Sequence, residues 1–182
     1  MKKTAMLFAE GFEEVEALTV VDLLRRAEIG CDMIALSGAE TVTGSHGIEV
    51  RASGALCDAD LDESDALLLP GGQPGTRNLA ADGRVLEALR RFQAAGKLTA
   101  AICAAPTVLA KAGVLNGRRA VCYPGLEPEL GGSLGGDGPV EVDGTVITSR
   151  GVGTAIPFAL AIVEYYLGAE KARELARAIV YR

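Results

Sequence analysis

The stretch Lys-Leu-Thr-Ala-Ala-Ile-Cys-Ala-Ala-Pro, residues 97–106, decides most of what the sequence predicts about the fold. Its apolar run, 98–102, is typical of a strand that is buried on both faces of a parallel sheet. Residues 104–112 then predict a helix, and Pro106 fits in its first turn because no helical hydrogen bond is lost there. Cys103 therefore falls at a strand-to-helix turn, the place where α/β folds carry their chemistry.

This position gives Cys103 two interpretations. Backbone N–H groups and the helix dipole at such a turn favour a nearby anion, which predicts a lowered thiol pKa and a thiolate that serves as nucleophile or redox centre. The alternative is an inert cysteine in the core, because cysteine is among the residue types most often buried. The position of Cys103 alone does not decide between these two interpretations.

Outward from this stretch, short apolar runs alternate with amphipathic segments. The predicted strands are 4–9, 31–37, 65–69, 98–102 and 119–122, with a hairpin turn at 45–47 that leads into an arm at 48–52, and a strand pair at 140–142 and 146–149. The predicted helices are 13–27, 85–95, 104–112, 154–167 and 169–180, with a helical turn near Asn78 and a surface loop around a short helix at 124–139. This alternation predicts a doubly wound, mostly parallel sheet sandwiched by helices, in a single domain over residues 1–182.

Composition excludes several classes of partner. The chain of 182 residues has 24 acidic and 18 basic side chains, a formal charge of −6, and no basic cluster. These numbers argue against nucleic acid and anionic membrane as partners. No window approaches the ~18 apolar residues of a membrane span, and the N-terminus lacks a signal-peptide core, so we expect a cytoplasmic location.

The cysteines and the single histidine argue against a metal site. Cys31, Cys57, Cys103 and Cys122 show no Cys-x-x-Cys spacing, and in a cytosolic protein this predicts free thiols. The single histidine, His46, lies in a polar turn where exposure is the simpler expectation. We therefore predict no metal and no cofactor.

Two further segments could complete a site around Cys103. Gly71-Gly72 directly follows a predicted strand, where it forms either a plain tight turn or a close backbone approach to a ligand. If Cys103 shares that crevice, the N–H groups of Gly72 and Ala104 could stabilise an oxyanion. Arg150 lies in Ser-Arg-Gly-Val-Gly-Thr (149–154), which resembles an anion-binding turn but lacks nucleotide-binding spacing, and a structural role for Arg150 is favoured over a substrate contact.

The acidic run Glu13-Glu14-Val15-Glu16 opens the first predicted helix. Acids in a first turn suit the helix dipole without any function, so the run alone favours a solvated face. Glu16 differs because Val20 and Leu23 lie on its own row of the helix, which predicts that it points inward. A buried carboxyl has a raised pKa and can exchange a proton with a nearby thiol.

Four motifs together resemble the ThiJ/PfpI superfamily, a group of class I glutamine amidotransferase-like domains. They are Glu-Gly-Phe-Glu-Glu-Val-Glu (10–16), Leu-Pro-Gly-Gly (69–72), Ala-Ala-Ile-Cys-Ala-Ala-Pro (100–106) and Thr-Ser-Arg-Gly-Val-Gly-Thr (148–154). Within the superfamily they are similar to the branch of the parkinsonism-associated protein deglycase and its small bacterial relatives. The resemblance covers nearly the whole chain.

The resemblance implies a flavodoxin-like sandwich that forms a homodimer, with the active site close to the subunit interface. It assigns Cys103 as an oxidation-sensitive nucleophile and Glu16 as a protonated carboxyl hydrogen-bonded to it, against the solvated-face interpretation. Gly71, Gly72 and Ala104 would supply backbone donors. Relatives often carry a histidine where this chain has Tyr123, and a tyrosine is no base near neutral pH. Ala104 also replaces the histidine of the protease-like branch, which disfavours a protease or an amidotransferase.

The family then implies a cofactor-independent enzyme that acts on 2-oxoaldehydes such as methylglyoxal, or on early glycation adducts of proteins. Cys103 would form a hemithioacetal and Glu16 would act as acid and base. The alternative is a redox sensor or oxidation-responsive chaperone, in which Cys103 becomes a sulfinate and no substrate turns over. The same residues serve both, and Cys31, Cys57 and Cys122 are expected to be structural. A role in thiazole or other vitamin metabolism rests on an old name for relatives and on no residue here.

Overall fold

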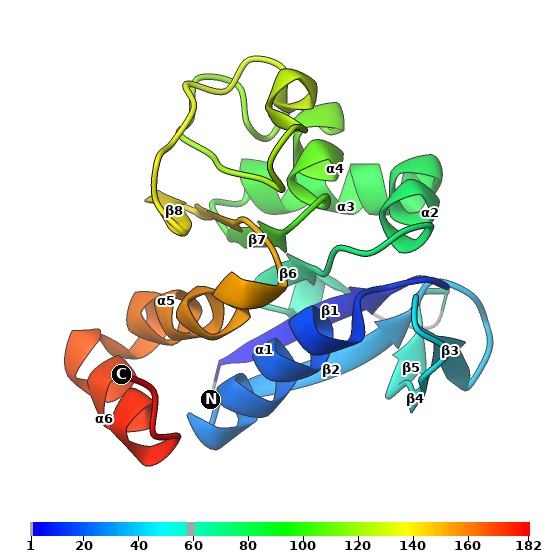
Figure 1. Cartoon of the computed structure of the whole chain (residues 1–182). Coiled ribbons are helices and arrows are strands. Elements are labelled where there is room, and N and C mark those ends of the chain that lie inside the picture. The colour runs from blue at the N-terminus through cyan, green and yellow to red at the C-terminus, as the bar shows by residue number, and fades with distance from the viewer. Residues whose placement is uncertain (1, 58–60) are drawn as a thin grey trace.

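A seven-stranded sheet forms the centre of the computed structural model, which describes residues 2–57 and 61–182 (Figure 1). Its strand order is β5-β2-β1-β6-β7-β9-β8. The strands are β1 (Lys3–Phe8), β2 (Gly30–Ala35), β5 (Gly54–Ala55), β6 (Ala66–Leu69), β7 (Leu98–Ile102), β8 (Val140–Asp143) and β9 (Val146–Ser149). Every neighbouring pair is parallel except β8 and β9. The predicted doubly wound, mostly parallel sheet is confirmed.

Helices cover both faces of this sheet (Figure 1). One side holds α1 (Glu14–Arg26) and α5 (Ala155–Leu167), with α6 (Ala169–Ala178) packed against α5, and the other holds α2 (Gly75–Ala81), α3 (Gly83–Ala94) and α4 (Pro106–Lys111). All five residues of β7 are buried, because their alternating side chains enter the two apolar cores in turn. Pro106 begins α4 at a position that needs no donor, as expected.

The shorter elements connect this framework. An antiparallel hairpin of β3 (Thr41–Thr43) and β4 (Glu49–Arg51) surrounds the predicted turn at 45–47. Single turns of 3-10 helix occur as η1 (Leu61–Glu63), η2 (Glu127–Leu130) and η3 (Val152–Thr154). The short helix η2 lies within the predicted loop 124–139. The two-residue strand β5 and η1 were not predicted, since segments this short show no period.

The strand predicted at 119–122 is wrong, because this segment has no strand structure. Its N–H groups bond to a side chain and a loop instead of a neighbouring strand: the Val121 N–H donates to Thr148 Oγ1 (2.9 Å) and the Ala120 N–H donates to the Gly135 carbonyl (3.3 Å). An apolar segment can therefore be buried beside β9 without joining the sheet. Burial, which the sequence pattern did predict, does not require a strand ladder.

The topology also determines where a site can form. The chain leaves β1 toward β2 on one side and later places β6 on the other side of β1, so the order of strands reverses there. The carboxyl ends of β1, β6 and β7 meet at this reversal, which is the usual ligand crevice of open α/β sheets. In the residues that the structure describes, no helix is long and apolar enough to cross a membrane.

Candidate active site

Cys103 occupies a strained backbone position directly after β7. Its φ is 65°, in the left-handed region that non-glycine residues rarely adopt. Two backbone hydrogen bonds hold it there: its N–H donates to the Ser149 carbonyl (3.0 Å), and its carbonyl accepts from the Tyr123 N–H (2.7 Å). The side chain stays partly exposed. Backbone strain that the surrounding structure maintains at a partly exposed cysteine is typical of a functional site.

Glu16 is fully buried beside this cysteine. Its row on α1 points inward as predicted, since Val20 and Leu23 are buried as well. Glu16 Oε2 accepts a hydrogen bond from the Gly71 N–H (2.9 Å), whereas Oε1 has no hydrogen-bond partner among the described residues. A methyl group placed on Gly151 would lie 3.9 Å from Oε1 and 4.0 Å from the Cys103 sulfur, so both atoms face one small space. An unpaired buried oxygen lowers the stability of the fold, so its presence beside the cysteine indicates a functional role.

The two groups control each other's protonation. Burial raises the pKa of Glu16 to about 7, although the Cys103 thiol and the Gly71 N–H oppose this as hydrogen-bond donors. Burial and the Glu16 carboxylate together raise the pKa of the Cys103 thiol to about 12. The lowered thiol pKa expected from the turn is therefore wrong, because the loss of hydration and a neighbouring negative charge outweigh the backbone donors. The Cys103 thiol therefore ionises more easily when Glu16 holds the proton, although burial still opposes it.

The backbone donors divide between these two groups. The N–H groups of Gly72 and Ala104 both act on the Cys103 sulfur and lower its pKa. The Gly71 N–H donates to Glu16 Oε2, so this backbone donor serves the carboxyl and not the sulfur. Gly71 matters for space instead, because a Cβ there would lie 2.5 Å from the Cys103 Cβ and 2.6 Å from Glu16 Oε2.

An open cavity of about 570 Å³ gives access to the sulfur. It is lined by Glu13, Glu16, Gly72, Cys103, Tyr123, Arg150, Gly151, Val152, Gly153 and Thr154. The Arg150 guanidinium lies 3.9 Å from the Glu127 carboxylate, which links the cavity wall to η2. Arg150 therefore has the structural contact that was favoured, and it also faces the space a substrate would enter. Tyr123 stands half exposed at the same wall.

The turn at 149–154 does not form the anion site that its sequence resembles. Thr154 Oγ1 accepts hydrogen bonds from the N–H groups of Arg150 (3.2 Å) and Gly151 (3.1 Å). These donors are used within the turn, so an anion in the cavity would contact the Arg150 side chain.

The comparisons with known proteins agree with this geometry. The DJ-1/PfpI family model matches residues 2–165 of the chain. The chain belongs to the DJ-1/PfpI family. This confirms the resemblance seen in the four motifs, which lie at the sheet edge around Cys103.

Similar proteins match most or all of this DJ-1/PfpI chain. "Protein dj-1beta" of Drosophila melanogaster is 40% identical over 99% of this chain and 98% of its own length. A protein of Pyrococcus abyssi that is named a deglycase is 34% identical over 81% of this chain and 89% of its own length. The solved structure of oxidized Toxoplasma gondii DJ-1 has a TM-score of 0.96 and 33% identity, covering 100% of this chain and 99% of that one.

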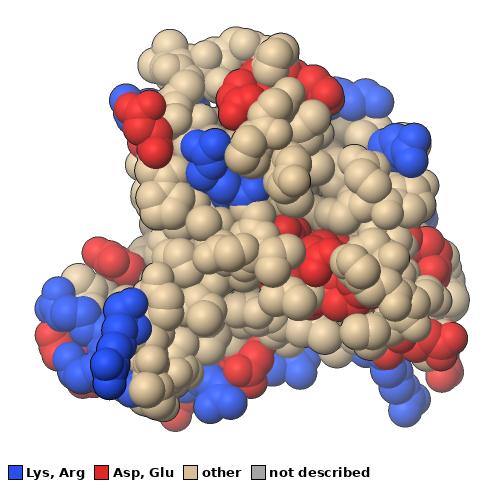
Figure 2. All heavy atoms as spheres, viewed as in Figure 1, with Lys and Arg blue, Asp and Glu red and all other residues tan. Residues whose placement is uncertain are grey.

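The acidic run at the start of α1 departs from the solvated face that its sequence favoured. Glu13, Glu14 and Glu16 are all buried, whereas the apolar Val15 is 51% exposed. Glu13 caps the helix by accepting from the Val15 N–H (3.3 Å), and Glu14 accepts from the N–H of His46 (2.7 Å). His46 is exposed as predicted, yet its ring also bonds to Glu14 (2.9 Å). Figure 2 shows acidic side chains gathered close to the N-terminal end of α1.

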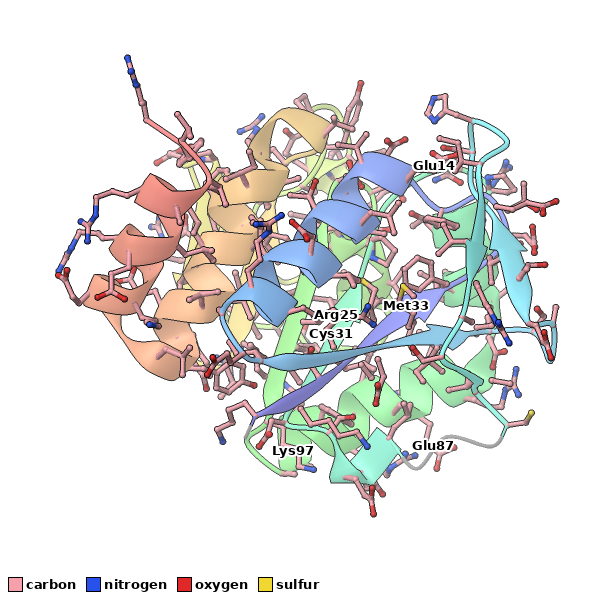
Figure 3. All side chains as sticks on the ribbon, turned by 90° about the horizontal axis from the view of Figure 1, so that it is seen from below. Glu14, Arg25, Cys31, Met33, Glu87 and Lys97 are labelled. Atoms are coloured by element: carbon pink, nitrogen blue, oxygen red, sulfur yellow. The ribbon has the colours of Figure 1, made fainter. Side chains whose placement is uncertain are left out.

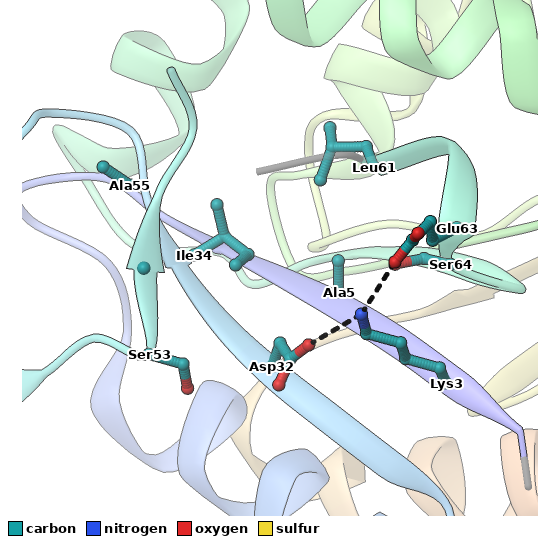
Figure 4. Close-up of a pocket in the computed structure, with 10 residues that line it drawn as sticks. Lys3, Ala5, Asp32, Ile34, Ser53, Ala55, Leu61, Glu63 and Ser64 are labelled. Carbon is teal, nitrogen blue, oxygen red and sulfur yellow. Dashed lines mark ion pairs between the residues drawn. The ribbon is translucent and has the colours of Figure 1, made fainter. Parts of the chain in front are cut away.

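A second cavity of about 300 Å³ lies beside β1, β2 and β5, away from Cys103 (Figure 4). Its cation, Lys3, lies 3.6 Å from both Asp32 and Glu63, so its charge is already paired. No cysteine or histidine lines it, and we assign it no chemistry. Of the remaining cysteines, Cys31 and Cys122 are buried and Cys57 is exposed, and all are free thiols as predicted.

Proposed function

We propose that this DJ-1/PfpI chain is a cofactor-independent cysteine enzyme acting on 2-oxoaldehydes, or on their early adducts with amines. The observation that carries the proposal is the buried Glu16 carboxyl, whose Oε1 borders the same small space as the Cys103 sulfur at an open cavity. A nucleophile beside a proton acceptor is the arrangement that covalent catalysis needs. The deglycase name of the Pyrococcus abyssi relative supports the same reaction class.

In the first step, the Cys103 thiol gives its proton to Glu16 as the sulfur attacks the aldehyde carbon. This proton transfer relieves one of the two obstacles to ionisation, because it removes the Glu16 charge that, together with burial, raises the pKa of the thiol. A carbon–sulfur bond forms, and the aldehyde oxygen develops negative charge. The N–H groups of Gly72 and Ala104 stabilise that charge before it is protonated to give the hemithioacetal.

In the second step, Glu16 moves a proton from C1 to C2. Deprotonated again, it removes the C1 proton to give an enediol and returns a proton to C2, which produces a thioester of the 2-hydroxy acid. Water then hydrolyses the thioester and restores the Cys103 thiol. A pKa near 7 suits this double role, since Glu16 can both accept and donate a proton at neutral pH. Tyr123 is not needed as a base.

The chain is further proposed to act as a homodimer with the cavity near the interface. Val15, Ile48 and Val152 are about half exposed, and they lie on α1, on the turn between β3 and β4, and at the cavity wall. Exposed apolar side chains on adjoining segments favour contact with another protein surface. Light scattering after size exclusion measures the mass, and a monomer would contradict this part.

A redox sensor is the second candidate function. Cys103 is partly exposed, and a protonated Glu16 could donate its Oε1 hydrogen to a sulfinate formed on that sulfur. The structure of the Toxoplasma gondii relative is described as oxidized, which supports oxidation chemistry in this family. No substrate would turn over in this case.

The test is methylglyoxal consumption with lactate detection near neutral pH, in wild type, Cys103→Ser and Glu16→Gln. Amine buffers are excluded, because they scavenge the aldehyde. We expect turnover in the wild type and its loss in both variants. If the wild type shows no turnover while peroxide adds two oxygens at Cys103 by intact mass, the enzyme proposal fails and the sensor remains.

A further inference from the structure

Three side chains with metal-ligating atoms lie together beside the active-site cavity. Glu13 and Glu14 come from the start of α1, and His46 comes from the turn between β3 and β4. One ligand atom from each lies within 4.8 Å of the other two. Figure 3 shows Glu14 at the end of α1 that adjoins this hairpin. The active site described above uses neither Glu14 nor His46.

The spacing of the donor atoms matches that of ligands around one ion. His46 Nδ1 lies 2.9 Å from Glu14 Oε2 and 3.4 Å from Glu13 Oε2. Ser45 Oγ lies 3.3 Å from each of these two oxygens and 3.1 Å from Nδ1. Ligands bound at about 2.1 Å stand about 3.0 to 3.4 Å apart in octahedral and tetrahedral geometry. Five of the six separations among these four donors therefore already match those that a small divalent ion imposes.

These contacts also outnumber the hydrogens available to make them. Five close contacts join Glu13 Oε2, Glu14 Oε2, Ser45 Oγ and His46 Nδ1. An ionised carboxylate has no hydrogen, a hydroxyl has one, and Nδ1 has one at most. At most two hydrogens therefore serve five contacts, so the hydrogens are shared between acceptors or lone pairs are brought together. A shared cation would satisfy all four atoms at once.

The fold holds these donors in place without help from an ion. Glu13 uses Oε1 to accept from the Val15 N–H, and Glu14 uses Oε1 to accept from the His46 N–H, so both Oε2 atoms remain for the shared position. The hairpin is anchored by the Ser45 N–H, which donates to the Phe12 carbonyl (2.8 Å). Gly44 leaves no room for a side chain, because the Glu14 carboxylate lies against it. The site is thus built from two segments about thirty residues apart.

We propose that Glu13, Glu14, His46 and Ser45 bind one divalent transition-metal ion at the rim of the active-site cavity, with Zn²⁺ as the ion that fits best. Two carboxylate oxygens with one imidazole nitrogen are a donor set typical of Zn²⁺, whereas Mg²⁺ and Ca²⁺ prefer oxygen ligands alone. The exposed side of His46 leaves room for water as a further ligand. Glu13 lines the catalytic cavity, so the ion would lie next to the space that holds the substrate.

The test uses the full chain with Cys103→Ser and Cys57→Ser, because both thiols are accessible and bind Zn²⁺ themselves. The protein is stripped with EDTA, dialysed and titrated with ZnCl₂ by calorimetry. We expect one Zn²⁺ per chain, and an affinity about tenfold or more weaker after His46→Gln or Glu14→Gln. Glu40→Gln, an exposed acid that precedes the same hairpin, is the matched control and should leave the affinity unchanged.

A second measurement follows the imidazole directly. The chain has a single histidine, so ¹⁵N-correlated spectra show one set of ring signals, and Zn²⁺ should shift Nδ1 far more than Nε2. His46 is exposed, so its replacement leaves the fold intact and keeps the test valid even if Glu14→Gln does not fold. Zn²⁺ that binds His46→Gln as tightly as its parent would overturn the proposal. So would the absence of heat and of any ring shift at a tenfold excess of Zn²⁺.

Discussion

Replacing Glu16 by glutamine should stabilise the protein at alkaline pH while it abolishes the proposed reaction. Burial raises the pKa of Glu16 from 4.5 to about 7, so the folded state opposes ionisation of this carboxyl. Between these values the folded chain holds a proton that the unfolded chain has released, and the free energy of unfolding falls as the pH rises. Each pH unit is worth about 1.4 kcal/mol, which makes the full penalty roughly 3 kcal/mol above pH 7.

Glutamine removes this penalty because it never ionises. Its carbonyl oxygen can still accept from the Gly71 N–H, so the contact that positions the side chain is kept. We expect the two proteins to have similar stability near pH 4.5. The advantage of Glu16→Gln should grow from there and level off at about 3 kcal/mol above pH 7.

The assay is urea unfolding between pH 4.5 and 8.5 for wild type, Glu16→Gln and the control Glu164→Gln, which changes an exposed glutamate on α5. A reductant keeps Cys103 as the thiol, and EDTA keeps the protein free of metal. The control should follow the wild-type profile throughout. A difference between wild type and Glu16→Gln that does not change with pH would refute the assignment of a raised pKa to Glu16.

Three further predictions test the surroundings of the site. Gly151→Ala should change the free energy of unfolding by less than about 1 kcal/mol, because the added methyl makes ordinary contacts and the backbone there is extended. The same methyl should lower kcat/KM about tenfold or more, because it crowds the Cys103 sulfur. Wild-type turnover in that variant would place the substrate elsewhere. Gly71→Ala should lower the free energy of unfolding by about 2 kcal/mol, because the added Cβ would overlap Cys103 and Glu16. An unchanged midpoint in denaturant titrations would show that this overlap does not occur. Asp65→Asn should be less stable than wild type at neutral pH but equal to it in acid. The Lys3 backbone N–H holds the pKa of Asp65 below 3.8, so the contribution of the carboxylate to the free energy of unfolding is lost as the pH falls through that range. Acid titration of the stability of both proteins measures the difference.

The sequence by itself determined the elements whose signal is local. The apolar run 98–102 predicted a strand buried on both faces, and Pro106 marked the first turn of the helix after it. The sequence also placed Cys103 at the turn between them, and it predicted a buried Glu16 carboxyl from the row that Glu16 shares with Val20. The four motifs identified the family.

Tertiary structure decided which groups pair with which. Gly71 could not be recognised as the donor to Glu16 rather than to a substrate, because β6 and α1 meet only in the folded sheet. The lowered pKa expected for the Cys103 thiol was reversed by burial and by the charge of Glu16, neither of which a turn shows. Glu14 was expected in solvent, yet a hairpin about thirty residues away covers it. Local pattern reports the shape of a segment, whereas protonation and hydrogen bonding depend on neighbours that only long-range packing brings into contact.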